Sequence, residues 1–116
     1  MTDLSQATWQ KIRQLFPAAL HDEVATVLEN ECGNNLPFLE AVDADALDRF
    51  RFAALKLSSG NLERLHEAID LAKTDWRDLL IYAGFADSVD AHRQWCIGDP
   101  LPPTTRRALR WTKEMK

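Results

Sequence analysis

Residues 61–84 read NLERLHEAIDLAKTDWRDLLIYAG, and the spacing of their apolar side chains predicts two consecutive α-helices. The apolar positions of the first helix recur every three or four residues, which places them on one face: Leu62, Leu65, Ala68, Ile69 and Ala72. Thr74 is expected to cap the second helix, and Gly84 is expected to end it because glycine adopts a positive φ at little cost. This stretch favours an all-α fold.

The same periodicity continues on both sides of this stretch. Ser5 is expected to cap a first helix that Pro17 interrupts, and the turn at residues 58–61 is expected to end a third helix. A third-helix stripe is formed by Leu47, Phe50, Ala54 and Leu57, and further helices are expected around residues 20–32 and 89–95. Since no segment shows sustained strand-like alternation, the sequence predicts a compact all-α bundle of about five to seven short helices.

The domain organisation follows from a cluster of prolines near the C-terminus. Residues 1–98 are expected to form the helical bundle domain, and residues 99–103 a stiff proline-rich linker. Residues 104–116 are compatible with a basic amphipathic C-terminal helix, in which Ala108, Trp111 and Met115 share one side. Docking of this helix on the bundle and its use as a binding arm both remain open.

Composition excludes several protein classes. With 46% hydrophobic and 28% charged residues over 116 positions, the chain has the composition of one globular domain. No apolar run approaches the length of a membrane-spanning helix, and the N-terminus lacks the pattern of a signal peptide, so a cytoplasmic location is expected. Cys32 and Cys96 belong to no metal-binding motif and are expected to be two reduced, partly buried thiols, with a disulfide as the alternative.

Charge is distributed unevenly along the chain. The net charge is −4, yet residues 104–116 contain five bases and one acid, so residues 1–103 carry −8. The candidate interaction surface is therefore the basic tail: Arg106, Arg107, Arg110, Trp111 and Lys113. An aromatic residue among arginines is typical of protein-binding hot spots, whereas the acidic body would repel nucleic acid.

One segment resembles a group of small uncharacterised bacterial proteins that carry a DWRDLL-x-x-AGF-like stretch. The resemblance rests on residues 61–65, 72–80 and 83–85 and extends over about residues 55–95. It implies a bacterial origin and an all-helical fold. It implies no activity, cofactor or catalytic residue.

The spacing Glu63-x-x-His66, with Asp70 one turn further on, is the strongest candidate for chemistry. Glu and His three positions apart lie on one side of a helix and form half of a di-iron or di-manganese site. The second half is missing, because neither His21 nor His92 has a glutamate three residues before it. Glu63 and Asp70 are expected to face solvent, away from the apolar stripe.

Other polar clusters have simpler explanations. His21-Asp22-Glu23 places two acids in the first turn of a helix, where the helix dipole favours them. Asp43-x-Asp45-x-x-Asp48 lacks the glycine and glutamate of a calcium loop. No P-loop, Rossmann, G-x-S-x-G or H-E-x-x-H motif occurs. The sequence therefore predicts no catalytic residue, no metal and no cofactor.

These observations favour a non-catalytic bacterial protein-binding or regulatory module, such as an adaptor or an immunity-like protein. An acidic domain suits a basic protein partner, and a homo-oligomer is a further option. Two alternatives remain open: a metal-dependent enzyme that uses Glu63, His66 and Asp70, and weak nucleic-acid binding through the basic C-terminal helix. A membrane partner is not expected.

Overall fold

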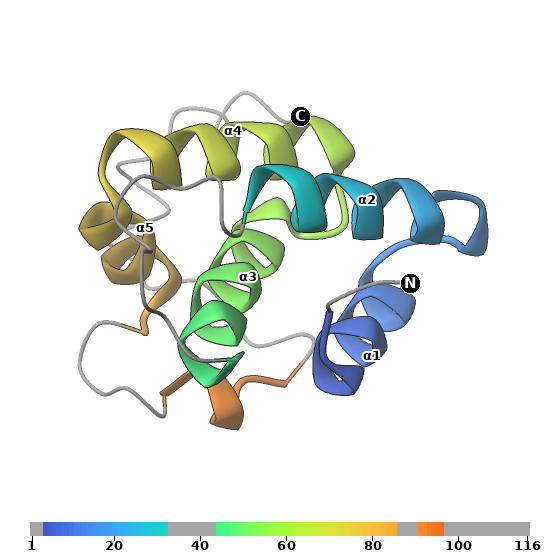
Figure 1. Cartoon of the computed structure of the whole chain (residues 1–116), viewed down its shortest axis with the longest axis horizontal. Coiled ribbons are helices and arrows are strands. Elements are labelled where there is room, and N and C mark those ends of the chain that lie inside the picture. Colours follow the sequence, from blue (N-terminus) through green and yellow to red (C-terminus); the bar gives the residue numbers. More distant parts are fainter. Residues whose placement is uncertain (1–3, 33–43, 86–90, 97–116) are drawn as a thin grey trace.

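The structure is a computed structural model that describes residues 4–32, 44–85 and 91–96, with the side chains of residues 44–47 left out. Over these ranges the regular elements are all helices (Figure 1): α1 (Gln6–Leu15), η1 (Ala18–Leu20), α2 (His21–Glu31), α3 (Ala44–Ser58), α4 (Leu62–Thr74), α5 (Trp76–Ala83) and η2 (Ala91–Gln94), where η denotes a 3₁₀ helix. The predicted all-α bundle is confirmed. The predicted linker, residues 99–103, and C-terminal helix, residues 104–116, lie outside the described residues.

Local signals set the ends of most helices. The Ser5 hydroxyl accepts a hydrogen bond from the backbone N–H of Thr8 at 3.1 Å and so caps α1, as the sequence predicts. Gly84 ends α5 with a φ of 82°, also as predicted. The prediction that Thr74 caps α5 is wrong, because the Asp75 carboxylate accepts from the N–H groups of Arg77 and Asp78. Thr74 is instead the last residue of α4.

Helix α3 lies at the centre of the molecule (Figure 1) and packs against α1, α4, α5 and η2. Every residue from Phe50 to Ser58 is buried except Lys56, which is half-buried. The sequence predicts a single apolar stripe on this helix, but the structure buries almost its whole circumference. A helix surrounded in this way is a core helix rather than an amphipathic surface helix.

The hydrophobic core collects side chains from every α-helix around α3. Its fully buried members include Ile12, Val24, Leu28, Leu55, Leu57, Leu65 and Leu79. At one end of the core, Phe52 meets the rings of His92 and Trp95 edge to face, with centroids 5.5 and 5.8 Å apart. Trp95 is buried, whereas Trp9 and Trp76 are half-buried against the core.

Three polar side chains tie α3 to its neighbours. The Asp48 carboxylate accepts hydrogen bonds from the hydroxyls of Ser5 at 2.9 Å and of Thr8 at 3.0 Å, which joins α3 to the start of α1. Arg49 donates to the carbonyl of Phe85 at 2.7 Å, just beyond α5. Arg51, only 1% exposed, donates from Nε to the carbonyl of Cys32 at 3.0 Å, at the end of α2. These bonds supply partners for polar groups that would be costly to bury alone.

The turn between α3 and α4 requires glycine at one position. Ser59 and Gly60 both have positive φ, at 51° and 83°. A Cβ atom added to Gly60 would lie 2.6 Å from the carbonyl oxygen of Leu15, which belongs to α1. Glycine therefore allows this turn to approach α1 closely.

Replacing Gly60 by alanine is expected to lower the free energy of unfolding by about 2 to 4 kcal/mol, because the variant combines a left-handed backbone with a backbone clash. Ser59→Gly, one residue earlier, is the matched control and is expected to change the free energy of unfolding by less than about 1 kcal/mol. Glycine relieves the strain of a positive φ at this position, but it also raises the entropy of the unfolded chain, and the two effects oppose each other. Urea denaturation followed by circular dichroism measures both. Equal stability of Gly60→Ala and the unmodified chain would contradict the close approach.

Candidate functional site

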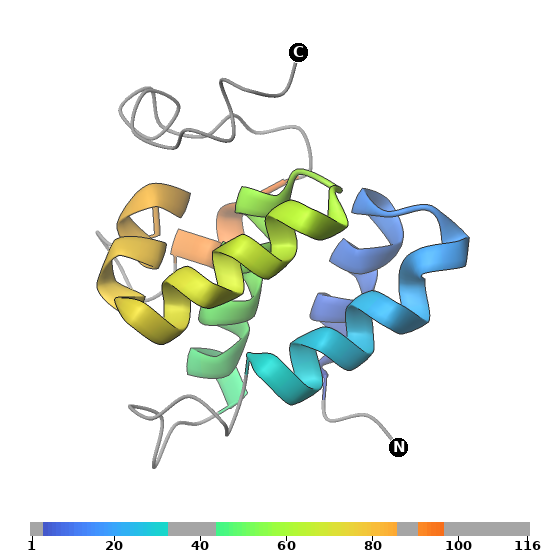
Figure 2. The ribbon, with the colours of Figure 1, turned by 90° about the horizontal axis from the view of Figure 1, so that it is seen from above.

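A groove of about 250 Å³ separates α2 from α4. Both helices lie on the same side of α3, as the two perpendicular views show (Figures 1 and 2). The groove is lined from α2 by Thr26, Val27, Asn30 and Glu31, and from α4 by His66, Ile69, Asp70 and Lys73. Aliphatic side chains thus lie between rims of polar and charged groups.

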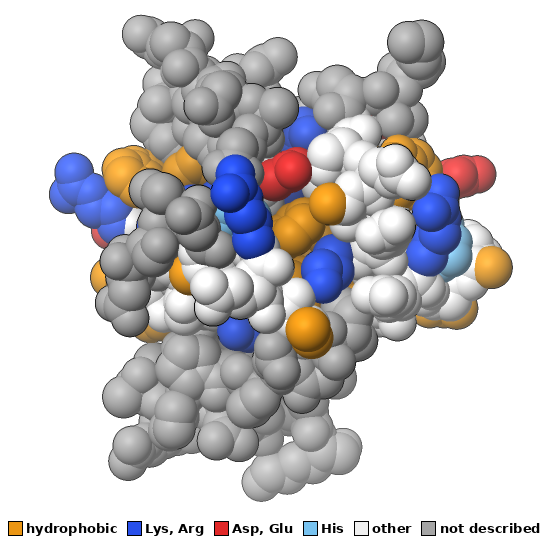
Figure 3. All heavy atoms as spheres, turned by 90° about the horizontal axis from the view of Figure 1, so that it is seen from below, with side chains coloured by type: hydrophobic (Ala, Val, Ile, Leu, Met, Phe, Trp, Pro, Cys, Tyr) orange, Lys and Arg blue, Asp and Glu red, His pale blue; other side chains and the backbone are white. Residues whose placement is uncertain are grey.

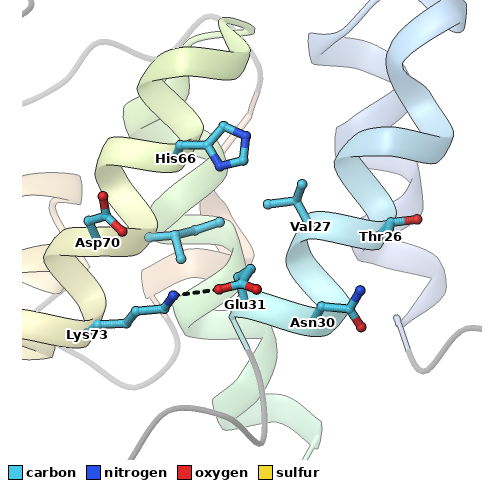
Figure 4. Close-up of a pocket in the computed structure, with 8 residues that line it drawn as sticks. Thr26, Val27, Asn30, Glu31, His66, Asp70 and Lys73 are labelled. Atoms are coloured by element: carbon cyan, nitrogen blue, oxygen red, sulfur yellow. Dashed lines mark hydrogen bonds and ion pairs between the residues drawn. The ribbon is translucent and has the colours of Figure 1, made fainter.

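An ion pair crosses the groove at one end (Figure 4). Lys73 Nζ lies 2.5 Å from Glu31 Oε1. This hydrogen bond lowers the pKa of the Glu31 carboxyl and raises the pKa of the Lys73 amine. The charge of Asp70 further raises the pKa of Lys73, so the ammonium group lies in the field of two carboxylates. Both partners stay charged over a wider pH range than usual.

The two helices carry most of the negative charge of the described residues. Helix α2 contains four acids and neither lysine nor arginine: Asp22, Glu23, Glu29 and Glu31. Helix α4 contains Glu63, Glu67 and Asp70 against Arg64 and Lys73. With histidine neutral, the net charge of the pair is −5, the sum of −4 on α2 and −1 on α4. We call the exposed and half-buried side chains of these two helices the α2–α4 face.

Of the three α4 residues that the metal-dependent alternative would use, two line the groove and Glu63 does not. Glu63, His66 and Asp70 are all exposed on α4, which confirms that Glu63 and Asp70 face solvent. His66 and Asp70 line the groove, and the His66 ring points toward α2 (Figure 4). Within residues 4–32, 44–85 and 91–96, no group of three or more His, Cys, Asp or Glu side chains could hold a metal ion.

The other predicted clusters have structural roles where they are described. The His21 ring donates from Nε2 to the carbonyl of Phe16 at 2.8 Å, and its neighbours Asp22 and Glu23 are exposed. The Asp48 carboxylate accepts hydrogen bonds from the hydroxyls of Ser5 and Thr8. Asp43 and the side chain of Asp45 lie outside the described residues.

A second hollow, of about 320 Å³, lies between α1, α3 and η2. It is lined by Ala7, Gln10, Lys11, Asp48, Phe52, His92 and Arg93. Figure 3 shows the molecule from the side opposite α2 and α4, where basic side chains surround hydrophobic atoms. Lys11 donates to the carbonyl of Trp95 at 2.7 Å and lies over the Trp95 ring. The Lys11 ammonium group and the Asp48 carboxylate in this hollow therefore form hydrogen bonds that stabilise the fold.

The two cysteines have contrasting environments, and neither is in a disulfide. Cys96 is exposed, whereas Cys32 is fully buried at the end of α2. Burial raises the pKa of the Cys32 thiol to about 12, against a smaller opposing effect of Arg51. Cys32 is therefore protonated at neutral pH and is not an activated nucleophile.

A thiol reagent such as Ellman's reagent at pH 8 is expected to modify one cysteine of the native protein rapidly, and that cysteine is Cys96. Cys32 is expected to react only after unfolding, because it is buried and because its raised pKa leaves almost no thiolate. The Cys96→Ser variant should then show no fast reaction in the native state and one reactive thiol in denaturant. A fast native reaction of that variant would contradict the placement of Cys32.

Sequence reasoning missed the groove itself, because its two walls come from segments about forty residues apart. The predicted interaction surface, Arg106, Arg107, Arg110, Trp111 and Lys113, lies outside the described residues. None of the described helices is long and apolar enough to cross a lipid bilayer. Comparisons with protein-family profiles, with curated proteins and with solved structures found no match.

Adding Zn²⁺, Mn²⁺ or Fe²⁺ to the untagged protein is expected to leave its melting temperature unchanged. Glu63, His66 and Asp70 do not form a ligand set, and a metal that bound only the native state would stabilise it. Thermal unfolding in the presence and absence of each ion measures this. A rise in melting temperature that disappears in the His66→Ala variant would support the alternative of a metal-dependent enzyme.

Proposed function

We propose that this chain is a non-catalytic protein-binding module and that a basic surface of its partner docks on the α2–α4 face. The observation that carries the proposal is the net charge of −5 on two adjacent helices, across whose groove Lys73 pairs with Glu31. Such a face attracts a positively charged partner at long range and disfavours negatively charged ones. Nucleic acid is therefore a poor ligand for this side of the molecule.

The groove also offers a small apolar contact between its charged rims. Val27 is half-buried and Ile69 is 2% exposed, and both line the groove between the charged rims. Protein interfaces commonly combine an apolar centre with a polar rim. A partner could thus be attracted by charge and retained by packing.

The pKa shifts of Glu31 and Lys73 do not suit these two groups to acid–base or nucleophilic catalysis. A general base at neutral pH needs a carboxyl pKa raised toward 7, and a nucleophilic lysine needs a lowered pKa. The ion pair does the opposite, since it lowers the pKa of Glu31 and raises that of Lys73. These two groups are stabilised in the charged forms that recognise an opposite charge.

The proposal includes a bacterial, cytoplasmic protein that acts as an adaptor or as an immunity-like inhibitor. The bacterial origin rests on the resemblance of residues 55–95. The immunity-like form is consistent with a small acidic domain that neutralises a basic protein by covering its surface.

A photo-crosslinking amino acid placed at Thr26, which is exposed and lines the groove, is expected to give a reproducible protein adduct in the producing cells. The same amino acid at Gln10, which is exposed beside the second hollow, should not give this adduct. Mass spectrometry of the adducts identifies the partner.

Charge dependence provides the matched control for this experiment. The triple variant Glu23→Gln, Glu63→Gln and Glu67→Gln should lose the adduct, whereas the corresponding aspartate variant, which keeps all three charges, should retain it. All three side chains are exposed, so stability should change little. Identical adducts from positions 26 and 10, or none from position 26, would count against the α2–α4 face as the binding surface.

A further inference from the structure

The Glu31–Lys73 pair places a cation inside an acidic groove. Lys73 reaches across from α4 to α2, and its ammonium group interacts with Glu31 directly and with Asp70 through space (Figure 4). The side chains of Lys73 and Glu31 remain 37% and 47% exposed. An ion pair this accessible to water is weak, typically worth less than about 1 kcal/mol, so an incoming cation can replace Lys73 at low cost.

The shape of the groove favours a long cationic side chain over a small ion. Val27 and Ile69 provide an aliphatic floor next to Glu31 and Asp70. Arginine and lysine have apolar stems that pack on such a surface while their charged heads reach a carboxylate. The arginine head also forms two parallel hydrogen bonds with one carboxylate, which the ammonium group of Lys73 cannot do.

We propose that the α2–α4 groove receives an arginine side chain from a basic segment of the protein partner, and that Lys73 occupies this place in the free protein. The incoming guanidinium takes over Glu31 while its stem covers Val27 and Ile69. Lys73 is released toward solvent and remains near Asp70. This inference rests on the proposed function and specifies the chemistry of its partner.

The choice of occupant follows from charge complementarity. The two helices that form the walls have a net charge of −5 and place Glu31 and Asp70 at the groove, which favours a cationic occupant. A metal ion lacks a sufficient ligand set among the described residues. A symmetric dimer through this face is disfavoured, because it would bring two like-charged α2–α4 faces together.

The test uses the full chain and a rhodamine-labelled hexa-arginine peptide, with affinity measured by fluorescence anisotropy at low ionic strength. Glu31→Gln is expected to weaken binding by at least about fivefold, because the arginine loses its carboxylate partner. Lys73→Gln is expected to tighten binding by about threefold, because the internal competitor is removed. A hexa-lysine peptide should bind more weakly than hexa-arginine.

Arg93→Gln is the matched control for the change in net charge. It removes one positive charge, as Lys73→Gln does, but lies in η2 beside the second hollow. Its affinity for the peptide should differ from that of the unmodified chain by less than twofold. If Lys73→Gln and Arg93→Gln increased the affinity for the peptide equally, the proposed displacement of Lys73 would be wrong. A crosslinked partner at position 26 would then still support the α2–α4 face as the binding surface.

Two further measurements keep the test decisive. In the unmodified protein, the NMR signal of the Lys73 ammonium group should shift when hexa-arginine is added, and an unchanged signal at saturation would overturn the proposal. Light scattering of the free protein should show a monomer. A dimer that disappears in Glu31→Gln would assign the groove to a second copy instead of an arginine-bearing partner.

Discussion

The burial of α3 is the constraint on which the rest of the structure depends. From Phe50 to Ser58 the helix is almost entirely enclosed, and α1, α4, α5 and η2 pack around it. Since the enclosed surface includes Arg51, the fold must provide hydrogen-bond acceptors inside the core. The carbonyl of Cys32 at the end of α2 is one of them, so the position of α2 is coupled to the interior of the bundle.

Much of the fold could be predicted from the sequence because its signals are local. The cap at Ser5 and the glycine end at Gly84 depend on residues within one turn, and both predictions are confirmed. The stripe on α4 was also read correctly, since a surface helix shows its buried side in its spacing. The cap of α5 was misplaced by one residue because Thr74 and Asp75 both carry suitable side chains, and geometry alone decides between them.

The features that the sequence did not reveal are those that join distant segments. The almost complete burial of α3 depends on how many helices pack around it. The spacing of apolar residues within α3 does not indicate that number. The sequence excludes Asp48 from a calcium loop but does not show its actual partners, the hydroxyls of Thr8 and Ser5, which lie 40 and 43 positions away at the start of α1. The ion pair between Glu31 and Lys73 likewise exists only because α2 and α4 lie on the same side of α3.

The hydrogen bond between Arg51 and Cys32 has a consequence for the groove. It fixes the carboxyl end of α2, and Glu31 is the residue immediately before the anchored carbonyl. The residue that carries the groove acid is therefore adjacent in the chain to the one whose carbonyl is held by Arg51. A partner that binds the groove only in the native state stabilises that state and makes opening of the core rarer. Such a partner would therefore slow hydrogen exchange at the amides of α3, although it contacts none of them.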